Sequence, residues 1–498
     1  MNVNPITRLD YPDPDVIRVE DIYYMVSTTM HFMPGCEILQ SFDLVHWEHV
    51  TYVYETLDHT DAQQLKSGQN IYGQGMWAAS LRYHEGRFYI CFVANDTRKT
   101  YLYTSEKIDG PWKKQLIEGF YHDGSLLFDE DGRNYIVYGN DEIWITELNE
   151  DLTAPKKDGL HRLLVSDHKN PELGYEGSHI QKINGYYYIF LIHSLRDRWM
   201  RTEACFYSDS LEGEFTGGDV LCDDRGYCGQ GVAQGGIVDT PDGKWYAMLF
   251  QDSGAVGRIP ILLPVTWKDH FPFFGQNGHV PEEIEVHSTR PGYIYQPLVG
   301  SDDFCNGLLP RWQFNHDPDP RYYHLDALQG TYTITTREVC TELTQAVNTL
   351  TQRMSYPSCA AEVTVDASAL KEGDVAGLCA LQSCYAAVGI TKHHGKYEVL
   401  MLDKKEDGIL DMTEGTVVES HQMDFRLEAD FCNMKDEARC YYRVNKGDWL
   451  PIGTVHKLYF KLDHFTGCRF GLFCYAAEET GGSACFRDFK YYDVDEIS

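Results

Sequence analysis

The sequence predicts an all-β protein in which a five-bladed β-propeller over residues 1–300 is followed by an antiparallel β-sandwich over residues 301–498. Three observations predict this fold: a short strand motif that recurs five times, a change to a different β pattern after it, and hardly any amphipathic helical stretch. At 498 residues, the chain also exceeds the size at which one hydrophobic core normally keeps growing, which indicates two domains.

The recurring motif is a turn residue followed three positions later by a tyrosine within a short apolar strand. Its copies are spaced by roughly 45 to 65 residues, which is typical of four-stranded propeller blades with variable loops. A sandwich of hairpins is the alternative architecture for such strands. The five tyrosines are Tyr24, Tyr89, Tyr135, Tyr188 and Tyr246.

From about Ser301 the repeat stops, and segments such as AAEVTVDAS, KYEVLML and RFGLFCY alternate apolar with polar residues. Alternation of this kind, with turns such as Lys392–Gly395 between the segments, predicts an antiparallel sandwich. The segment from Pro291 to Asp303 is the expected linker between the two domains.

A formal net charge of −32 and a pI near 4.9 argue against nucleic acid or an anionic membrane as a partner, because either would be repelled. A neutral ligand such as a sugar is compatible with this charge. The 34 tyrosines and 9 tryptophans suit stacking on sugar faces, but they suit a β-rich core equally well.

The N-terminal segment MNVNPITRLDYPDPD has neither the basic nor the apolar region of a signal peptide, and no later stretch has the length of a membrane span. Fifteen cysteines without metal-type pairs are typical of buried thiols in a reducing compartment. We therefore expect a cytoplasmic protein. The oligomeric state is left open, and a homo-oligomer is compatible with the sequence.

Counting back from the repeat tyrosines identifies five equivalent positions. Because the strand before the repeat strand is innermost in a propeller, side chains at these positions should converge on the axis. Three carboxylates, an indole and an amide would then surround one pocket. The residues are Asp13, Trp77, Asp123, Glu176 and Gln234.

Three carboxyl groups in one pocket raise one another's pKa, which is the condition that a general acid needs. Cleavage of a glycosidic bond uses two carboxyl groups, one protonated and one ionised. Taken one at a time, such residues often cap loops or bind a structural cation. Their common register favours a shared functional role instead.

The segments Tyr11–Arg18, His122–Gly132 and Tyr175–Tyr188 resemble motifs of glycoside hydrolase family 43, in particular its two-domain β-xylosidases and α-L-arabinofuranosidases. The resemblance covers essentially the whole chain. It implies an inverting mechanism with a concanavalin-like sandwich domain. In the catalytic roles it implies Asp13 as general base, Glu176 as general acid, and Asp123 as the residue that orients the acid and tunes its pKa.

The resemblance further implies that Trp77 and Phe32 pack on the sugar and that Arg258 binds its hydroxyl groups. The alternatives are blade-core aromatics and an inter-blade ion pair. Gln234 stands where many family members carry a histidine that helps to hold a central calcium ion. A glutamine carbonyl can also ligate calcium, so a structural calcium at the propeller centre stays open, while the chemistry requires no cofactor.

The segment Phe465–Arg469 is similar to a loop with which family xylosidases place a phenylalanine against the active site, and here Arg469 stands at that position. We expect Arg469 to bind substrate at the pocket wall, paired with a carboxylate or a sugar hydroxyl. The alternative is a solvent-facing sandwich residue. The sandwich itself is expected to close the pocket as a lid, with Asn348–Arg353 at the interface, rather than to act as an independent carbohydrate-binding module.

The predicted function is an exo-acting glycoside hydrolase that releases terminal pentose from xylo-oligosaccharides or arabinoxylan fragments, a β-1,4-xylosidase with α-L-arabinofuranosidase activity. An arabinofuranosidase with little xylosidase activity is the alternative within the class. A non-catalytic sugar-binding propeller is disfavoured because it has no need of three convergent carboxylates. A fructan-cleaving propeller is disfavoured because its Asn-Asp-Pro-Asn motif is absent from the N-terminal segment.

Overall fold

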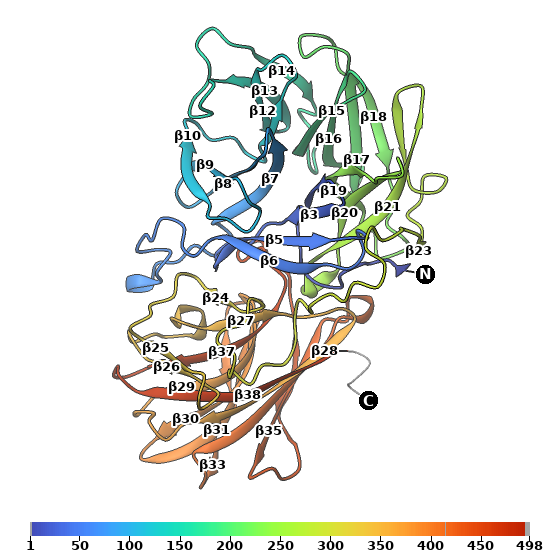
Figure 1. The fold of residues 1–498 in the computed structure, drawn as a ribbon. Helices are drawn as coiled ribbons and strands as arrows, with labels where there is room; N and C mark the ends of the chain where they lie inside the picture. Colours follow the sequence, from blue (N-terminus) through green and yellow to red (C-terminus); the bar gives the residue numbers. More distant parts are fainter. Residues whose placement is uncertain (1, 414, 494–498) are drawn as a thin grey trace.

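In the N-terminal part of the chain, sheets of four antiparallel strands surround a common axis and form the upper body in Figure 1. The structure is a computed structural model and describes residues 2–413 and 415–493. We number the sheets as blades 1 to 5 in chain order. From the axis outward, their strands are β2 (Asp15–Val19), β3 (Ile22–Val26), β5 (Gly35–Ser41) and β6 (Glu48–Tyr54); β7 (Met76–His84), β8 (Arg87–Ala94), β9 (Lys99–Ser105) and β10 (Lys113–Ile117); β11 (Ser125–Phe128), β12 (Asn134–Asn140), β13 (Glu142–Leu148) and β14 (His161–Ser166); β15 (Glu176–Ile183), β16 (Tyr186–Ser194), β17 (Arg201–Ser208) and β18 (Thr216–Leu221); β19 (Val232–Asp239), β20 (Trp245–Asp252), β21 (Arg258–Lys268) and β22 (Phe271–Phe274).

The innermost strands contact one another in a closed ring. Strand β2 lies against β7 and β19, β11 lies against β7 and β15, and β15 lies against β19. The ring confirms the predicted five-bladed propeller and excludes a sandwich of hairpins for this part of the chain. A short two-stranded sheet pairs β1 (Asn2–Val3) with β23 (Glu283–Ile284), so the first described residues bind the segment that follows blade 5.

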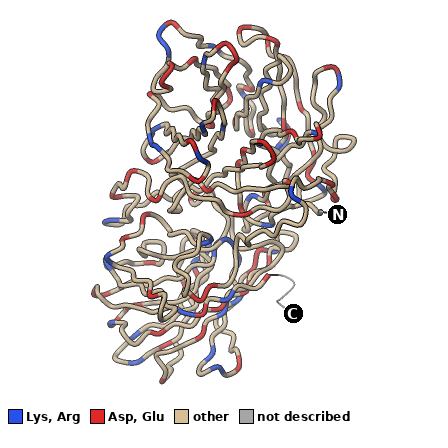
Figure 2. Tube along the Cα trace, viewed as in Figure 1, with Lys and Arg blue, Asp and Glu red and all other residues tan. Residues whose placement is uncertain are grey.

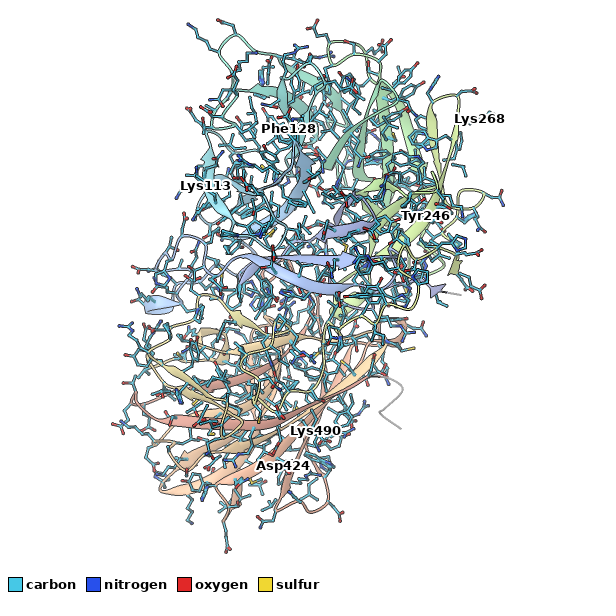
Figure 3. All side chains as sticks on the ribbon, in the orientation of Figure 1. Lys113, Phe128, Tyr246, Lys268, Asp424 and Lys490 are labelled. Carbon is cyan, nitrogen blue, oxygen red and sulfur yellow. The ribbon has the colours of Figure 1, made fainter. Side chains whose placement is uncertain are left out.

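Each repeat tyrosine packs in a different apolar cluster between two blades. Tyr135, Tyr188 and Tyr246 are buried in the clusters between blades 3 and 4, blades 4 and 5, and blades 5 and 1. Tyr24 lies in the cluster between blades 1 and 2, and Tyr89 packs against the cluster between blades 2 and 3. The sequence repeat therefore marks equivalent inter-blade contacts, of which Figure 3 labels the one at Tyr246.

Arg82 of β7 ties the innermost strands together. Its Nη1 atom lies 2.8 Å from Asp15 Oδ2, and its Nη2 atom donates to Ser125 Oγ at 2.6 Å. Further hydrogen bonds run to the carbonyl oxygens of Leu126 and Ile180, at 2.8 and 3.2 Å. Because these partners belong to blades 1, 3 and 4, one guanidinium group on blade 2 links four blades.

The C-terminal part consists of two antiparallel sheets packed on a large apolar core, the lower body in Figure 1, which confirms the predicted sandwich. One sheet contains β4 (Phe32–Met33), β24 (Gln313–Asn315), β27 (Leu350–Arg353), β37 (Arg469–Tyr475), β29 (Val375–Leu381), β30 (Ala386–His393), β31 (Lys396–Lys404) and β32 (Leu410–Met412), with β33 (Thr416–Val418) also paired to β31. The other contains β25 (Tyr323–Asp326), β26 (Thr331–Thr335), β38 (Ser483–Asp493), β28 (Ser358–Asp366), β34 (Gln422–Asp430), β35 (Glu437–Val444) and β36 (Leu450–Lys457).

Helical structure in the described residues is confined to single 3₁₀ turns. No helix within residues 2–413 and 415–493 has the length and apolar character needed to cross a bilayer. Acidic residues are spread along the chain in both parts of the molecule and are interspersed with lysine and arginine (Figure 2). The turns are η1 (Lys66–Gly68), η2 (Gly254–Val256), η3 (Leu343–Gln345) and η4 (Cys432–Met434).

The propeller and the sandwich share a sheet. Strand β4 belongs in sequence to the loop between β3 and β5 of blade 1, yet it pairs with β24 of the sandwich, with Met33 opposite Phe314 and Phe32 opposite Asn315. Side chains fill the space between the two parts (Figure 3). The backbone position of Phe32 therefore depends on the C-terminal domain.

Arg353, in the segment expected at the interface, adds a buried polar link between the two parts. Its Nε atom donates to the carbonyl oxygen of Asp10 at 2.9 Å, and its Nη1 atom lies 2.8 Å from Glu37 Oε2. Its guanidinium also lies over the Tyr11 ring, 4.1 Å from the centroid. Because all of these groups are buried, separating the domains would leave charges unpaired.

Replacing Arg82 with methionine should destabilise the protein by about 3 to 5 kcal/mol, because it leaves the buried Asp15 carboxylate without its cationic partner. Chemical denaturation followed by intrinsic fluorescence measures this change. Arg18→Met is the matched control, since the pair between Arg18 and Asp239 also joins two blades but is partly exposed, and it should cost less than about 1 kcal/mol. Equal losses in the two variants would contradict a central role for Arg82.

Candidate active site

Near the start of each innermost strand, one residue has a left-handed backbone. The φ angles are 52° at Asp13, 32° at Ala78, 48° at Asp123, 65° at Gly177 and 59° at Gln234. Register shifts occur at the same level in β7, β15 and β19. Left-handed geometry costs a residue with a side chain about 1 to 2 kcal/mol, so this repeated kink is a strained feature of the kind that gathers at functional sites.

The kinks bring the predicted polar residues together. A small cavity is lined by Asp13, Asp123 and Gln234, together with Ala78 and Gly177. In blades 2 and 4 the left-handed residue comes one position after the predicted one, so Trp77 and Glu176 directly precede the kink. The five positions that are equivalent in the sequence therefore lie at the same height along the propeller axis.

Asp13 is held by two polar contacts. Its Oδ1 atom lies 2.7 Å from Arg258 Nη1, and its Oδ2 atom accepts a hydrogen bond from Thr28 Oγ1. The Thr28 hydroxyl in turn accepts a hydrogen bond from the Ala78 amide at 2.8 Å. Both members of the Asp13–Arg258 ion pair are buried, so the orientation of the Asp13 carboxyl group is fixed.

Asp123 and Glu176 lie side by side with His122 between them. His122 Nε2 is 3.5 Å from Asp123 Oδ2 and 3.6 Å from Glu176 Oε2. Asp123 Oδ2 also accepts the Gly177 amide at 2.9 Å, which fixes the backbone directly after Glu176. Asn140 Nδ2 donates to Glu176 Oε2 at 2.7 Å. These contacts suit a pair in which one carboxyl group orients the other.

The three groups perturb one another. Burial raises the pKa of Asp123 to about 6, with the carboxylates of Glu176 and Asp13 adding to the rise and His122 opposing it. The negative charge of Asp123 raises the pKa of His122 from 6.5 to about 9, with Glu176 contributing and burial opposing. At neutral pH a cationic imidazole therefore stands between two carboxyl groups.

The sandwich contributes an aromatic side chain to this pocket. Phe465, in the loop before β37, lies 5.2 Å from Trp77 between ring centroids, and the Arg258 guanidinium lies 4.4 Å from the centre of the Phe465 ring. Trp77 also contacts the His122 ring at 6.1 Å. Phe465 is not among the site residues predicted from the sequence, although it is the first residue of the Phe465–Arg469 loop.

Arg469 lies behind this wall rather than in it. Its guanidinium is stacked on the Phe32 ring at 3.5 Å from the centroid, and its Nη1 atom donates to Gln313 Oε1 at 2.8 Å. Burial lowers the pKa of Arg469 to about 9. The expected pairing with a clustered carboxylate is not observed, because Arg258 occupies Asp13, and the solvent-facing alternative is wrong because Arg469 is only 3% exposed. Its contact with Phe32 makes it a support for the predicted sugar-packing ring.

Gln234 packs against the backbone that carries Glu176. A side chain at Gly177 would place its Cβ atom 2.7 Å from Gln234 Cδ, so the close approach requires glycine there. The backbone N–H of Gln234 donates to Glu203 Oε2 at 2.7 Å. Glu203 is fully buried in β17, and this burial raises its pKa well above 4.5. Glu203 thus fixes the kink at Gln234 from the neighbouring blade.

A second axial layer was not predicted. His179 Nδ1 lies 3.1 Å from Asp15 Oδ1, and Ser80 and Ser125 occupy the corresponding level of blades 2 and 3. Asp15 and Ser125 follow Asp13 and Asp123 by two positions, which returns them to the same face of their strands. Ser80 and His179 follow Trp77 and Glu176 by three positions, because a register shift in each strand adds one residue. The same count that selected Asp13 would have found Asp15, two residues further along the sequence.

In the axial pocket, Asp123 and Glu176 are linked through His122, while Asp13 is bound separately by Arg258. Carboxyl groups with separate roles in one pocket suit the chemistry of a glycoside hydrolase. The chain belongs to the glycosyl hydrolases family 43, whose family model matches residues 3–272. Residues 301–492 match the β-xylosidase C-terminal concanavalin A-like domain. The chain is therefore an enzyme of the glycoside hydrolase class, with the concanavalin-like domain that the resemblance implied.

Among curated relatives, a β-xylosidase of Formosa agariphila is 26% identical over 99% of this chain and 89% of its own length. A non-reducing end α-L-arabinofuranosidase of Bacteroides ovatus is 24% identical over 82% of this chain and 79% of its own. A solved structure described as a bifunctional GH43-CE protein of Bacteroides eggerthii is 42% identical, with a TM-score of 0.93. It covers all of this chain, which spans 64% of that protein's length.

Protonated His122 should stabilise the fold. Because its pKa is about 9 in the folded protein and 6.5 as a free group, this stabilisation is fully present below about pH 6.5 and is lost as the pH rises to about 9. The free energy of unfolding should fall over this interval, and it should fall less steeply in His122→Gln. Urea denaturation at closely spaced pH values measures both slopes. Parallel curves for the two proteins would show that His122 does not carry the dependence.

Proposed function

We propose that this enzyme is an exo-acting, inverting hydrolase that releases terminal pentose from xylo-oligosaccharides or arabinoxylan fragments, a β-1,4-xylosidase with α-L-arabinofuranosidase activity. The supporting observation is that Asp13 and Glu176 occupy one pocket with different partners. Asp13 is bound by Arg258 and Thr28, whereas Glu176 is linked to Asp123 through His122 and the following amide. Two carboxyl groups in unlike environments suit two different roles.

In the proposed reaction, Asp13 removes a proton from the water that attacks the anomeric carbon, while Glu176 protonates the departing glycosidic oxygen. Asp123 orients Glu176 through the Gly177 amide. An inverting reaction needs room for the water, with carboxyl groups about 6.5 to 9.5 Å apart. Each proton transfer of this kind contributes about 10²- to 10⁴-fold to the rate.

We propose that the sandwich is a lid for this pocket. Phe465 stands against Trp77 and Arg258, and β4 fixes the loop that carries Phe32. An indole, two phenyl rings and a guanidinium group then surround one terminal sugar, with Trp77 and Phe32 packing on it and Arg258 bonding its hydroxyls. A pocket closed on one side admits a chain end rather than the middle of a chain, which supports exo action.

An α-L-arabinofuranosidase with little xylosidase activity is the second candidate. The name of the Bacteroides ovatus relative favours it, whereas that of the Formosa relative favours a xylosidase. Hydrolysis of aryl β-xyloside and aryl α-L-arabinofuranoside by the purified enzyme decides between them. A cytoplasmic location and the oligomeric state stay predictions from the sequence.

The enzyme's chemistry needs no cofactor, and a calcium ion forms no part of the proposed mechanism. Calcium prefers six to eight oxygen ligands. At the axis, both oxygens of Asp15 are already bound, by Arg82 and His179. Among the described residues, the group with metal-ligand spacing is His122, Asp123 and Glu176, which offers one nitrogen and few oxygens. These residues do not form a calcium-type site.

Asp13→Asn and Glu176→Gln should each lower kcat on natural oligosaccharides by about 10²- to 10⁴-fold, because both changes keep the side-chain size and remove the acid–base function. Steady-state kinetics with xylobiose and arabinoxylan fragments, together with circular dichroism to verify folding, measures the effect. A folded variant that keeps more than about a tenth of wild-type activity, against the usual acid–base contribution, would remove its residue from the mechanism.

The leaving group distinguishes the two variants. Glu176→Gln should lose less rate on aryl glycosides whose leaving groups need little protonation, while Asp13→Asn should lose similar rate on good and poor leaving groups. An equal loss across leaving groups in Glu176→Gln would argue against Glu176 as the acid.

The sugar released first should have the anomeric configuration opposite to that of the substrate, because water attacks directly and no glycosyl-enzyme forms. Proton NMR recorded before mutarotation shows the configuration. Release with retained configuration would mean that a carboxylate acts as nucleophile, and the roles given to Asp13 and Glu176 would then be wrong.

A further inference from the structure

The contacts of the sandwich with the propeller gather around blades 1, 2 and 5, and include a ring contact of 6.5 Å between Tyr356 and Tyr227, in the segment that joins blade 4 to blade 5. The sandwich contacts described above reach blade 1 through β4 and Arg353 and blade 2 through Phe465, and the Cys468 amide binds the Ala255 carbonyl of blade 5 at 2.8 Å. On the side of blades 3 and 4, Asn140 is exposed and Glu176 is partly exposed. Because Glu176, as the proposed acid, would contact the departing oxygen, the part of a substrate beyond the scissile bond would lie beside this exposed side of blades 3 and 4.

A tryptophan lies on this exposed side. In blade 4, Glu176 pairs with Ile192 of β16, and Ser194 at the end of β16 pairs with Arg201 at the start of β17. The turn 195–200 between these strands therefore projects at the pocket end of the blade. Adjacent strands are about 4.8 Å apart, so β17 lies roughly 10 Å outward from the strand of Glu176. Trp199 stands in this turn.

Hydrogen bonds on both sides of Trp199 close the turn. The Ser194 hydroxyl donates to the Arg198 carbonyl at 3.3 Å and accepts the Met200 amide at 2.8 Å. The Leu195 amide donates to the Met200 carbonyl at 3.1 Å. The backbone on both sides of Trp199 is hydrogen-bonded, yet 46% of the residue is exposed to solvent. Among the described residues, Trp199 is the only tryptophan that is exposed rather than buried or half-buried.

Alternating arginines and aromatic rings connect Trp199 with the catalytic pocket. The Arg201 guanidinium lies 5.6 Å from the Trp199 ring centroid and 5.1 Å from that of Phe250, and the Arg258 guanidinium lies 5.2 Å from the same Phe250 centroid. Arg201 is itself fixed by Asp252 at 3.2 Å. Since Arg258 binds Asp13, a continuous series of contacts through Arg258, Phe250 and Arg201 connects the pocket with the exposed indole.

We propose that Trp199 forms a binding subsite for the leaving-group side of the substrate, in which the indole stacks on a sugar ring of the chain beyond the scissile bond. A fixed, exposed aromatic face supported by a cation on one side is suited to the apolar face of a pyranose. This inference rests on the proposed function, because it names the part of the oligosaccharide that the same active site binds outside its pocket.

Trp199→Ala should lower kcat/KM on xylotriose by about tenfold, the size of one good aromatic stacking contact, mainly through a higher KM. On β-xylosyl fluoride, whose leaving group is a single atom and cannot reach the turn, the variant should stay within about twofold of wild type. Trp199→Phe should recover much of the loss on xylotriose. Tyr83→Ala is the matched control, since Tyr83 is 45% exposed at the end of β7 opposite to the pocket.

An unchanged kcat/KM on xylotriose in Trp199→Ala would overturn the subsite. An equal loss on xylotriose and the fluoride would also overturn it, because it would show a general structural effect. If the wild-type enzyme hydrolyses neither substrate, the proposed function is overturned, and the subsite with it. Activity of the wild type on the fluoride therefore separates the two failures.

Discussion

The ion pair between Arg82 and Asp15 is the contact on which the arrangement of the propeller depends. It lies at the axis, where the innermost strands of all blades meet, and the same guanidinium reaches Ser125 and Ile180. Burial alone would raise the pKa of Asp15, but the Arg82 charge, together with His179 and the hydrogen bond from the Leu81 amide, holds the pKa below 3.8. The axis is thus closed by paired charges rather than by apolar packing, and the catalytic level is built directly above it.

Above that layer, the protein accepts backbone strain in order to place charge. Left-handed residues at the same level of every innermost strand bring Asp13 and Asp123 to one cavity and set Glu176 beside them. Except at Gly177, each left-handed residue costs free energy, and crowded carboxyl groups cost free energy too. The surrounding sheets, with their inter-blade tyrosines, supply the stability that tolerates both. His122 offsets part of the repulsion by standing between Asp123 and Glu176 as a cation.

The pocket is a product of both domains. The loop of Phe32 is a strand of the sandwich sheet, and Arg469 supports that ring from behind. Phe465 crosses from the sandwich to Trp77. The C-terminal domain therefore contributes side chains and a strand partner to the candidate site, and under the proposed function a change at the interface would act on substrate binding through these aromatic rings. The proposed subsite at Trp199 would extend this pocket on the side of blade 4.

The sequence by itself determined the five-bladed fold, the sandwich after it and the convergence of Asp13, Asp123 and Glu176. It could do so because these features repeat at a fixed distance from a turn and a tyrosine, and a periodic pattern survives without knowledge of distant contacts. The tertiary structure alone decided that Arg258 binds Asp13, that Phe465 rather than Arg469 reaches the pocket, and that Arg82 links the blades. Those pairings join residues far apart in the chain, and a single sequence carries no record of which distant side chains meet.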